Sequence, residues 1–165
     1  MKFDPSIVQA RFASPLGPML VAATTQGLAG IWFEQQRHFP DARGWPQAPQ
    51  HPLLQAATRQ LTEYFAGDRM TFDLPLDLHG GTAFQQSVWR ALLAIPRGNT
   101  ISYRTLSERT GCPAGARAVG AAVGRNPLTI VVPCHRVVGA DGSLTGYAGG
   151  LERKRALLRL EGAAA

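Results

Sequence analysis

Short apolar runs alternate with turn residues along the first 33 positions of the chain. Each run is five or six residues long, and glycine, proline or polar residues separate it from the next. This spacing is typical of strands joined by tight turns, so it predicts a three-stranded antiparallel meander. The three runs are Ile7–Phe12, Met19–Ala23 and Leu28–Phe33.

A loop and then an amphipathic helix follow these strands. The segment 37–50 contains three prolines and a glycine, so we expect a loop there. Apolar residues then recur at helical spacing and stop before Gly67, which predicts a helix with one buried face. The apolar positions of this helix are Leu53, Leu54, Ala57, Leu61, Tyr64 and Phe65.

The second half of the chain begins after a predicted linker at Asp77–Gly81. Thr82 and Gln85 have the spacing of a capping box, which predicts a helix that begins after Thr82. Pro96-Arg97-Gly98 is expected to end this helix, and a last helix is expected over Leu151–Gly162. The predicted buried stripe of the first helix is Phe84, Val88, Ala91, Leu92 and Ile95.

Two short helices are predicted in between. Ser102 is a suitable N-cap for Tyr103–Thr110, Gly111-Cys112-Pro113 reads as a tight turn, and Ala114–Val123 follows as a second helix. Helices joined in this way are typical of a helix-turn-helix, although any helical hairpin has a similar pattern. The predicted fold class is α+β: a small amino-terminal antiparallel sheet with a helix, then a mostly helical domain containing a helix-turn-helix. We expect the domains to cover residues 1–78 and 79–165.

Charge is unevenly distributed between the two halves. Residues 1–82 hold six Lys and Arg against seven Asp and Glu, whereas residues 83–165 hold eleven against four. A basic half joined to a neutral half indicates a polyanion partner such as nucleic acid. Solvated arginines on a generally basic protein would give the same total charge.

Composition excludes several other classes of protein. Hydrophobic residues make up 45% of the chain and charged residues 17%, as in a globular protein. No apolar run approaches the ~20 residues of a membrane span, and the first residues lack a signal-peptide pattern. The two cysteines, Cys112 and Cys134, make no disulfide framework, so a reducing, cytoplasmic setting is expected. The amino-terminal half has no cysteine and only scattered histidines, so no metal site is predicted there.

The most reactive stretch of the sequence follows a β-branched run. Ile130-Val131-Val132 predicts a buried strand, and Pro133 would end its pairing, leaving Cys134 at the edge of a packed element. Because the thiolate is the nucleophile, and a nearby cation lowers the pKa of a cysteine, the adjacent His135 favours a reactive thiol. A cysteine among such residues is otherwise a small core hydrophobe.

Two helices carry a side chain that stands out from its neighbours. Glu161 lies on the same face as Leu157 and Leu158, so its carboxylate needs a partner unless the helix end frays into water. Arg117 is the only long side chain of a helix otherwise made of small residues. Such a helix either packs tightly inside the protein or enters a narrow groove, where one arginine can hold a base stack open.

These motifs together resemble one family. Pro133-Cys134-His135-Arg136-Val137, with Asn126-Pro127 before it and Gly146-Tyr147 and Gly149-Gly150 after it, resembles the O6-alkylguanine-DNA alkyltransferases. The resemblance extends from about Phe84 to Glu161, and more loosely to residues 14–18. It implies a ribonuclease-H-like amino-terminal domain, a carboxy-terminal domain for DNA binding and alkyl transfer, and no cofactor or metal.

The resemblance also implies the role of each catalytic residue. Cys134 would attack the alkyl carbon, His135 would accept the thiol proton through a water, and Glu161 would orient His135. Tyr103 would protonate the departing guanine, and Asn126 would tie the DNA-binding helix to the reactive turn. The product would be a thioether, which gives water no carbonyl to attack, so a single turnover per molecule is expected.

The remaining implied residues contact DNA or the base. The implied partner is duplex DNA containing O6-alkylguanine, with O4-alkylthymine as a further lesion, and the protein would act as a monomer. Because the alkylated base is held within the stack, chemistry on it requires extrusion. Some relatives have a serine where this chain has Ala148. The DNA-binding residues are Arg117, Arg104, Ala118 and Gly120, and the pocket residues are Val137, Tyr147 and Ala148.

Two other classes share part of this pattern. A hydrolase would use the same Cys/His pair on an acyl group, and it would need an oxyanion hole. A non-catalytic helix-turn-helix protein would use the two short helices alone, and it would function without Cys134.

Overall fold

The computed structural model describes residues 1–112 and 115–163. Residue contacts divide the chain into two units, Met1–Gly81 and Thr82–Ala165. Each unit has its own sheet and helices, and the reactive stretch lies in the second. The division at residue 78 that the sequence suggests stays a prediction.

The amino-terminal unit is built on the predicted antiparallel meander. Strands β1 (Val8–Ser14), β2 (Gly17–Thr24) and β3 (Gly27–Phe33) pair in the order β1-β2-β3, which confirms the predicted sheet. Gly27 opens β3 with φ +151°, and a Cβ atom there would lie 2.9 Å from the carbonyl oxygen of Pro75. Only glycine fits this close approach of two backbone segments without strain.

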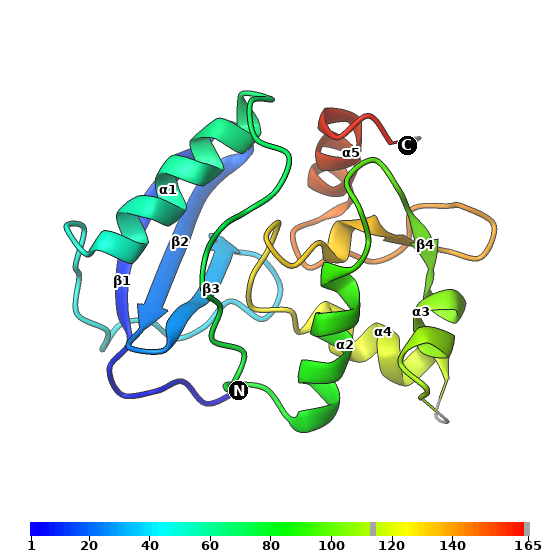
Figure 1. The fold of residues 1–165 in the computed structure, drawn as a ribbon, viewed down its shortest axis with the longest axis horizontal. Helices are drawn as coiled ribbons and strands as arrows, with labels where there is room; N and C mark the ends of the chain where they lie inside the picture. The colour runs from blue at the N-terminus through cyan, green and yellow to red at the C-terminus, as the bar shows by residue number, and fades with distance from the viewer. Residues whose placement is uncertain (113–114, 164–165) are drawn as a thin grey trace. The chain divides into compact units, whose positions relative to one another are not determined.

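The two faces of this sheet are covered differently. Helix α1 (Pro52–Phe65) lies across one face, as Figure 1 shows, and the predicted helical pattern is confirmed. The opposite face carries an aromatic cluster around Trp32, whose ring lies 5.9 Å from that of Trp45. The buried Gln9 side chain donates to the carbonyls of Ala42 and Trp45, and it thereby holds the predicted loop against the sheet.

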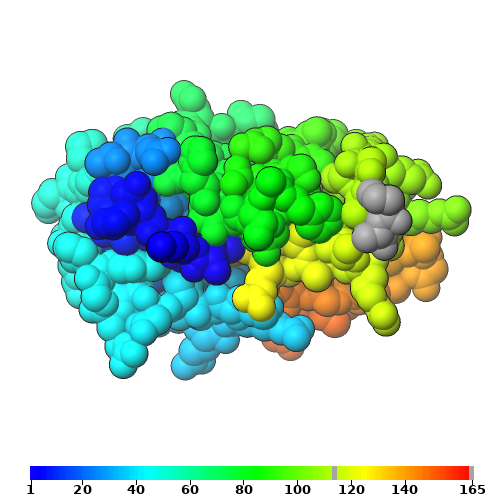
Figure 2. Space-filling view, turned by 90° about the horizontal axis from the view of Figure 1, so that it is seen from below, coloured from blue at the N-terminus to red at the C-terminus, as the bar shows by residue number. Residues whose placement is uncertain are grey.

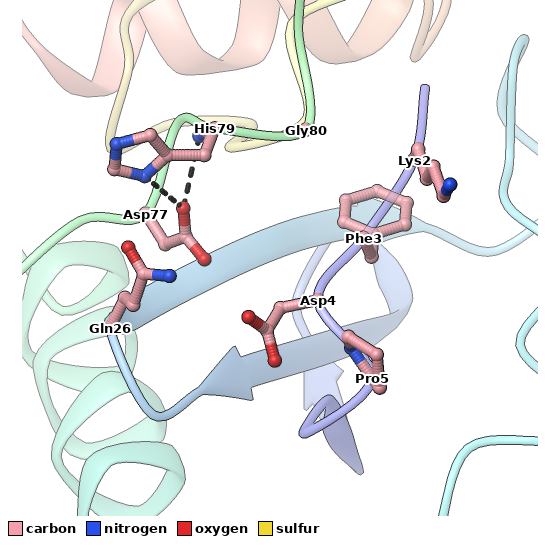
Figure 3. Close-up of a pocket in the computed structure, with 8 residues that line it drawn as sticks. All are labelled: Lys2, Phe3, Asp4, Pro5, Gln26, Asp77, His79 and Gly80. Atoms are coloured by element: carbon pink, nitrogen blue, oxygen red, sulfur yellow. Dashed lines mark hydrogen bonds and ion pairs between the residues drawn. The ribbon is translucent and has the colours of Figure 1, made fainter.

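An extended segment closes the free edge of β3. Leu28 exchanges backbone hydrogen bonds with Pro75 and Asp77, both 2.8 Å long. The buried Asp77 carboxylate accepts from Thr24 Oγ1 at 2.7 Å and lies 2.8 Å from Nδ1 of His79. Asp77 and His79 border a pocket of about 260 Å³ that also includes Asp4 and Gln26 (Figure 3).

The carboxy-terminal unit begins with helix α2 (Ala83–Leu93). The Thr82–Gln85 capping box is present, which confirms the predicted start of this helix. The predicted stripe is only partly right, because Phe84 is 38% exposed whereas Trp89 is fully buried. Trp89 faces the core beside Val88, and its Nε1 donates to the carbonyl of Ala122 at 2.9 Å. Phe84 lies in the first turn of the helix, where solvent reaches the side chain.

Two short helices follow the two-residue strand β4 (Ile101–Ser102). Ser102 caps helix α3 (Tyr103–Arg109) as predicted, and its Oγ accepts from the backbone N–H of Thr105 at 3.0 Å. Helix α4 (Ala116–Gly124) packs against α3 and α2. Part of the predicted turn at 111–113 and the predicted helix start at Ala114 lie outside the described residues. The helix-turn-helix interpretation of this pair stays a prediction.

The reactive stretch is buried but is not the predicted strand. Ile130 has φ +76°, and Val132 N–H donates to the carbonyl of Leu128 at 2.8 Å, so the run makes tight turns. A continuous apolar run indicates burial, but it does not by itself distinguish a strand from buried turns. The 3₁₀ turn η1 (Cys134–Arg136) follows, and then β5 (Val137–Val138), which pairs in parallel with β4. Helix α5 (Leu151–Leu160) packs against η1.

Candidate active site at Cys134

Asn126 links the end of α4 to the reactive turn. Its Oδ1 accepts from the backbone N–H of Leu128 at 2.9 Å, and its Nδ2 donates to the carbonyl of Val132 at 2.8 Å. The side chain of Asn126 also hydrogen bonds to the thiol of Cys134. The tight turns that replace the predicted strand are therefore held in place by one buried amide.

Glu161 is the centre of a buried charged cluster. It is the C-cap residue of α5, and its Oε2 lies 2.8 Å from Nε2 of His135. Arg136 binds the same carboxylate through Nε at 2.8 Å and Nη2 at 3.0 Å, while its Nη1 donates to the carbonyl of Ile95 at 2.6 Å. Of the two alternatives for Glu161, pairing rather than fraying is what the structure shows.

This cluster favours a neutral imidazole with one available nitrogen. Burial lowers the pKa of His135, and the charge of Arg136 acts in the same direction, while the hydrogen bond to Glu161 opposes them. Because Glu161 accepts at Nε2, the proton of the neutral ring belongs on Nε2. Nδ1 is buried and has no hydrogen-bond partner among the described residues, so its lone pair is available to accept a proton.

Cys134 is a protonated thiol in this resting arrangement. Its side chain is buried, and burial raises its pKa. The amide of Asn126 and the charge of Lys154 act in the opposite direction. The sequence led us to expect that the adjacent imidazole lowers this pKa. That expectation is wrong, because burial outweighs the groups that favour the thiolate.

Tyr103 and the glycine-rich loop lie close to the same site. The hydroxyl of Tyr103 is hydrogen bonded to the side chain of Thr145, and burial raises the pKa of this phenol, which therefore stays protonated. A Cβ atom on Gly120 would lie 3.7 Å from the Tyr103 ring, so α4 passes directly beside it. Of the predicted pocket residues, Val137 is buried, whereas Tyr147 and Ala148 are half-buried.

The predicted DNA-binding residues lie around α3 and α4. Arg117 is exposed, and Ala118 and Gly120 are half-buried on the same helix. Arg104 is exposed on α3, 3.6 Å from Glu108. Parts of both helices reach the surface in the space-filling view, where they are coloured yellow-green to yellow (Figure 2). The two arginines expected to bind DNA are thus exposed, whereas the residues expected for chemistry are buried, except for the half-buried Tyr103.

Sequence reasoning missed one residue at this site and assigned no role to another. Lys154 is fully buried and donates to three backbone carbonyls, and Arg136 binds Glu161. A signal for Lys154 was available, because it lies three and four residues before Leu157 and Leu158 on the same apolar face as Glu161. The partner of Arg136 was not visible, because 25 positions separate it from Glu161.

The described residues were also compared with the requirements for a disulfide, a metal site and a membrane span. Cys112 and Cys134 are both free thiols. Residues 1–112 and 115–163 contain no group of three or more His, Cys, Asp or Glu side chains arranged to hold a metal ion. Within the same ranges, no helix has the length and apolar character needed to cross a membrane.

The second unit combines a thiol, a histidine–carboxylate pair and a helix with an exposed arginine. This combination is typical of proteins that use a cysteine as a nucleophile. Comparison with known proteins identifies the family. Residues 7–78 match the ribonuclease-like domain of 6-O-methylguanine DNA methyltransferase, and residues 83–163 match its DNA binding domain. The chain belongs to this family, which confirms the resemblance seen in the sequence.

Individual relatives cover nearly the whole chain. A methylated-DNA–protein-cysteine methyltransferase of Mycobacterium bovis is 49% identical over 148 residues, which covers 90% of this chain and 88% of the relative. That of Salmonella typhimurium is 43% identical over 166 residues, with 94% and 96% covered. The crystal structure of Mycobacterium tuberculosis O6-methylguanine methyltransferase matches with a TM-score of 0.86 at 46% identity, covering 96% of this chain and 94% of that one.

A second solved relative was crystallised with nucleic acid. Mycobacterium tuberculosis OGT in complex with DNA matches with a TM-score of 0.84 at 46% identity, covering 96% of this chain and 95% of that chain. The family match and this complex together support DNA binding by the carboxy-terminal unit.

Proposed function

We propose that this protein repairs DNA by moving an alkyl group from O6 of guanine onto the sulfur of Cys134. The buried Cys134 thiol carries the proposal, because it lies in the same cluster as a neutral histidine whose Nδ1 can accept a proton. Membership of the methyltransferase family supports the same reaction.

The proposed transfer balances in protons and electrons. His135 takes the thiol proton at Nδ1 through a water, and Glu161 and Arg136 hold the ring in the tautomer that makes this possible. The thiolate then forms the S–C bond as the C–O6 bond breaks, and the bonding electrons stay on guanine. Tyr103 gives guanine a proton. The protonated His135 then returns a proton to Tyr103, so both residues end in their starting forms. The overall change exchanges one thiol hydrogen for one alkyl group.

The proposed reaction needs the damaged base outside the helix. Arg117 on the exposed side of α4 would enter the minor groove and hold the space that the base leaves, with Ala118 and Gly120 allowing close approach. Arg104 would contact phosphate. The cost of extrusion, a few kcal/mol, is smallest for a damaged pair. The base would then lie against Tyr147, Val137 and Ala148.

The oligomeric state, the compartment and the number of turnovers that we propose follow from the same site. All the reacting groups come from one chain, which supports action as a monomer. Two free thiols suit a reducing compartment, so we place the protein in the cytoplasm. Duplex DNA with O6-alkylguanine is the proposed partner, and O4-alkylthymine is a second substrate to test. The thioether product is not hydrolysed, so each molecule reacts once.

Intact mass tests this reaction directly. Wild-type protein mixed with duplex DNA containing O6-methylguanine should gain one methyl group, located by peptide mass on Cys134. Cys134→Ser should gain none, while Cys112→Ser should react like the wild type. Repeated turnover at substoichiometric protein, or equal function of Cys134→Ser, would instead favour a hydrolase or a purely DNA-binding protein.

The role of Arg117 is tested by comparing two substrates. Arg117→Ala should slow repair of duplex DNA at least about tenfold. Without the arginine side chain, nothing fills the space that the base leaves, so the base stays stacked more of the time. Transfer from free O6-benzylguanine, which needs no extrusion, should be nearly unchanged. Arg43→Ala, which removes an exposed arginine of the amino-terminal unit, is the matched control. Equal losses on both substrates would remove the wedge role.

A further inference from the structure

Lys154 is a buried cation with an unusual set of partners. Its side chain is fully buried in α5, and its Nζ donates to the carbonyls of Val137 at 2.6 Å, Thr145 at 2.8 Å and Gly146 at 3.3 Å. A buried charge is normally paired with an opposite charge. Among the described residues, no carboxylate forms an ion pair with Lys154, so its charge is solvated by backbone dipoles alone.

Together with Lys154 and the Cys134 thiol, the buried charged cluster around Glu161 therefore carries one surplus positive charge. Glu161 is the only buried carboxylate of the described part of this unit, and Arg136 and His135 already bind it. With His135 neutral, Arg136 balances Glu161 and Lys154 remains unbalanced. The other titratable groups near the site are Tyr103 and Tyr147, and burial raises the pKa of Tyr103, so this phenol is neutral. Ionisation of Cys134 with loss of its proton to solvent would make the whole cluster neutral.

We infer that Lys154 is the counter-cation of the Cys134 thiolate and the positioning residue of the pocket loop. Its charge offsets the loss of solvation that opposes ionisation of the buried sulfur. Its three hydrogen bonds join β5, directly after the reactive turn, to Thr145 and Gly146, and the side chain of Thr145 binds Tyr103. One ammonium thus connects the nucleophile, the pocket loop and the proposed proton donor.

The electrostatic interaction between Lys154 and the Cys134 thiolate affects the titration of both groups. Burial lowers the pKa of Lys154, the Cys134 thiolate partly opposes this shift, and the resulting pKa is about 8. Because coupling between two sites is reciprocal, each group must shift the titration of the other by the same amount. Removing the thiolate should therefore be visible on Lys154 itself.

The inference rests on the proposed function for its biological meaning, but the effect of Lys154 on the pKa of the Cys134 thiol can be measured without DNA. The pH dependence of iodoacetamide alkylation, measured at Cys134 by peptide mass, reports the apparent pKa of the thiol. Lys154→Gln keeps donors for the carbonyls and removes the charge, so this pKa should rise by about 1 to 3 units. Lys154→Arg keeps the charge and should stay close to the wild type.

A matched control separates local from general charge effects. Arg155→Gln removes the neighbouring cation from the exposed side of α5 and should leave the thiol pKa unchanged. A folded Lys154→Gln protein with the wild-type thiol pKa would overturn the inference. Methyl transfer from O6-methylguanine DNA is measured in parallel on the wild type. Loss of that reaction would reject the proposed function, whatever Lys154 does to the thiol.

A second measurement needs no change at Lys154. The chain has only two lysines, Lys2 and Lys154, so ¹³C-lysine NMR gives two side-chain signals, and Lys2→Arg assigns them. Alkylation of Cys134 removes the thiolate and should move the titration of Lys154 to lower pH by about 1 unit or more. Lys2 should not respond. An identical Lys154 titration before and after alkylation would overturn the inference even if Lys154→Gln fails to fold.

Discussion

Each unit of this protein contains a buried or partly buried histidine–carboxylate pair, and these two pairs have the same length. His79 Nδ1 lies 2.8 Å from Asp77 Oδ1, and His135 Nε2 lies 2.8 Å from Glu161 Oε2. The environments differ completely, because the His79 side chain is 68% exposed whereas that of His135 is fully buried. The first pair closes a local turn two residues long, as Figure 3 shows, and the second joins residues 26 positions apart.

The difference shows that distance alone says little about the role of such a pair. Water competes for the exposed His79, so the pair contributes little beyond shaping a turn. No water competes inside the second pair, where desolvation selects the neutral imidazole and the carboxylate selects its tautomer.

Buried polar groups show the same contrast across the two units. In the amino-terminal unit, Gln9 and Gln60 bind backbone carbonyls, and Asp77 binds Thr24 and a backbone N–H, so each fixes a separate loop or edge. In the carboxy-terminal unit the buried charges converge on Glu161 and Cys134. Convergence of buried titratable groups is the pattern expected of a reactive site.

The largest expected difference between the two pairs is in stability. Glu161→Gln leaves Arg136 buried without its counter-charge, so it should lower the free energy of unfolding by about 3–5 kcal/mol. Asp77→Asn, the matched change in the other pair, should cost less, because most of its partners are neutral donors. Urea denaturation of both variants measures this. A smaller loss for Glu161→Gln than for Asp77→Asn would contradict the contrast.

The next effect is a pH dependence that belongs to the buried pair. The folded-state pKa of His135 is lowered, so the unfolded chain binds the proton more readily, and stability is lost as pH falls below the unfolded value. We expect a slope of up to about 1.4 kcal/mol per pH unit below about pH 6.5. Unfolding free energies of the wild type and His135→Gln from pH 7.5 to 5 measure it. His79→Gln, which removes the exposed imidazole, serves as the control and should keep the slope.

The smallest effect is expected at the exposed pair. His79→Ala should change the free energy of unfolding by no more than about 1 kcal/mol, because an exposed ion pair contributes little. Methyl transfer from O6-methylguanine DNA should proceed at the wild-type rate. A loss of transfer activity in a folded His79→Ala protein would show that the pair has a role beyond its turn.

Several elements were predictable because their signals are local. The Thr82–Gln85 capping box, the Ser102 cap and the three-stranded meander depend on neighbours in sequence, and the structure contains all of them. The strand predicted at Ile130–Val132 was wrong, because an unbroken apolar run indicates only that the segment is buried. Phe84 was wrongly placed in the buried stripe and Trp89 was left out of it, because the packing partner of a helix, here Ala122, decides which side of an apolar stripe is covered.

The sequence by itself determined the chemistry that is available: a thiol next to an imidazole, a carboxylate and a lysine on one apolar helix face, and a slim helix with a single arginine. Tertiary structure decided which of these groups meet and in what charge state. Arg136 and His135 share one carboxylate, and the partners of Lys154 within residues 1–112 and 115–163 are backbone carbonyls. The physical reason is that burial and long-range pairing set the solvation of each charge, and neither quantity can be read from neighbouring residues.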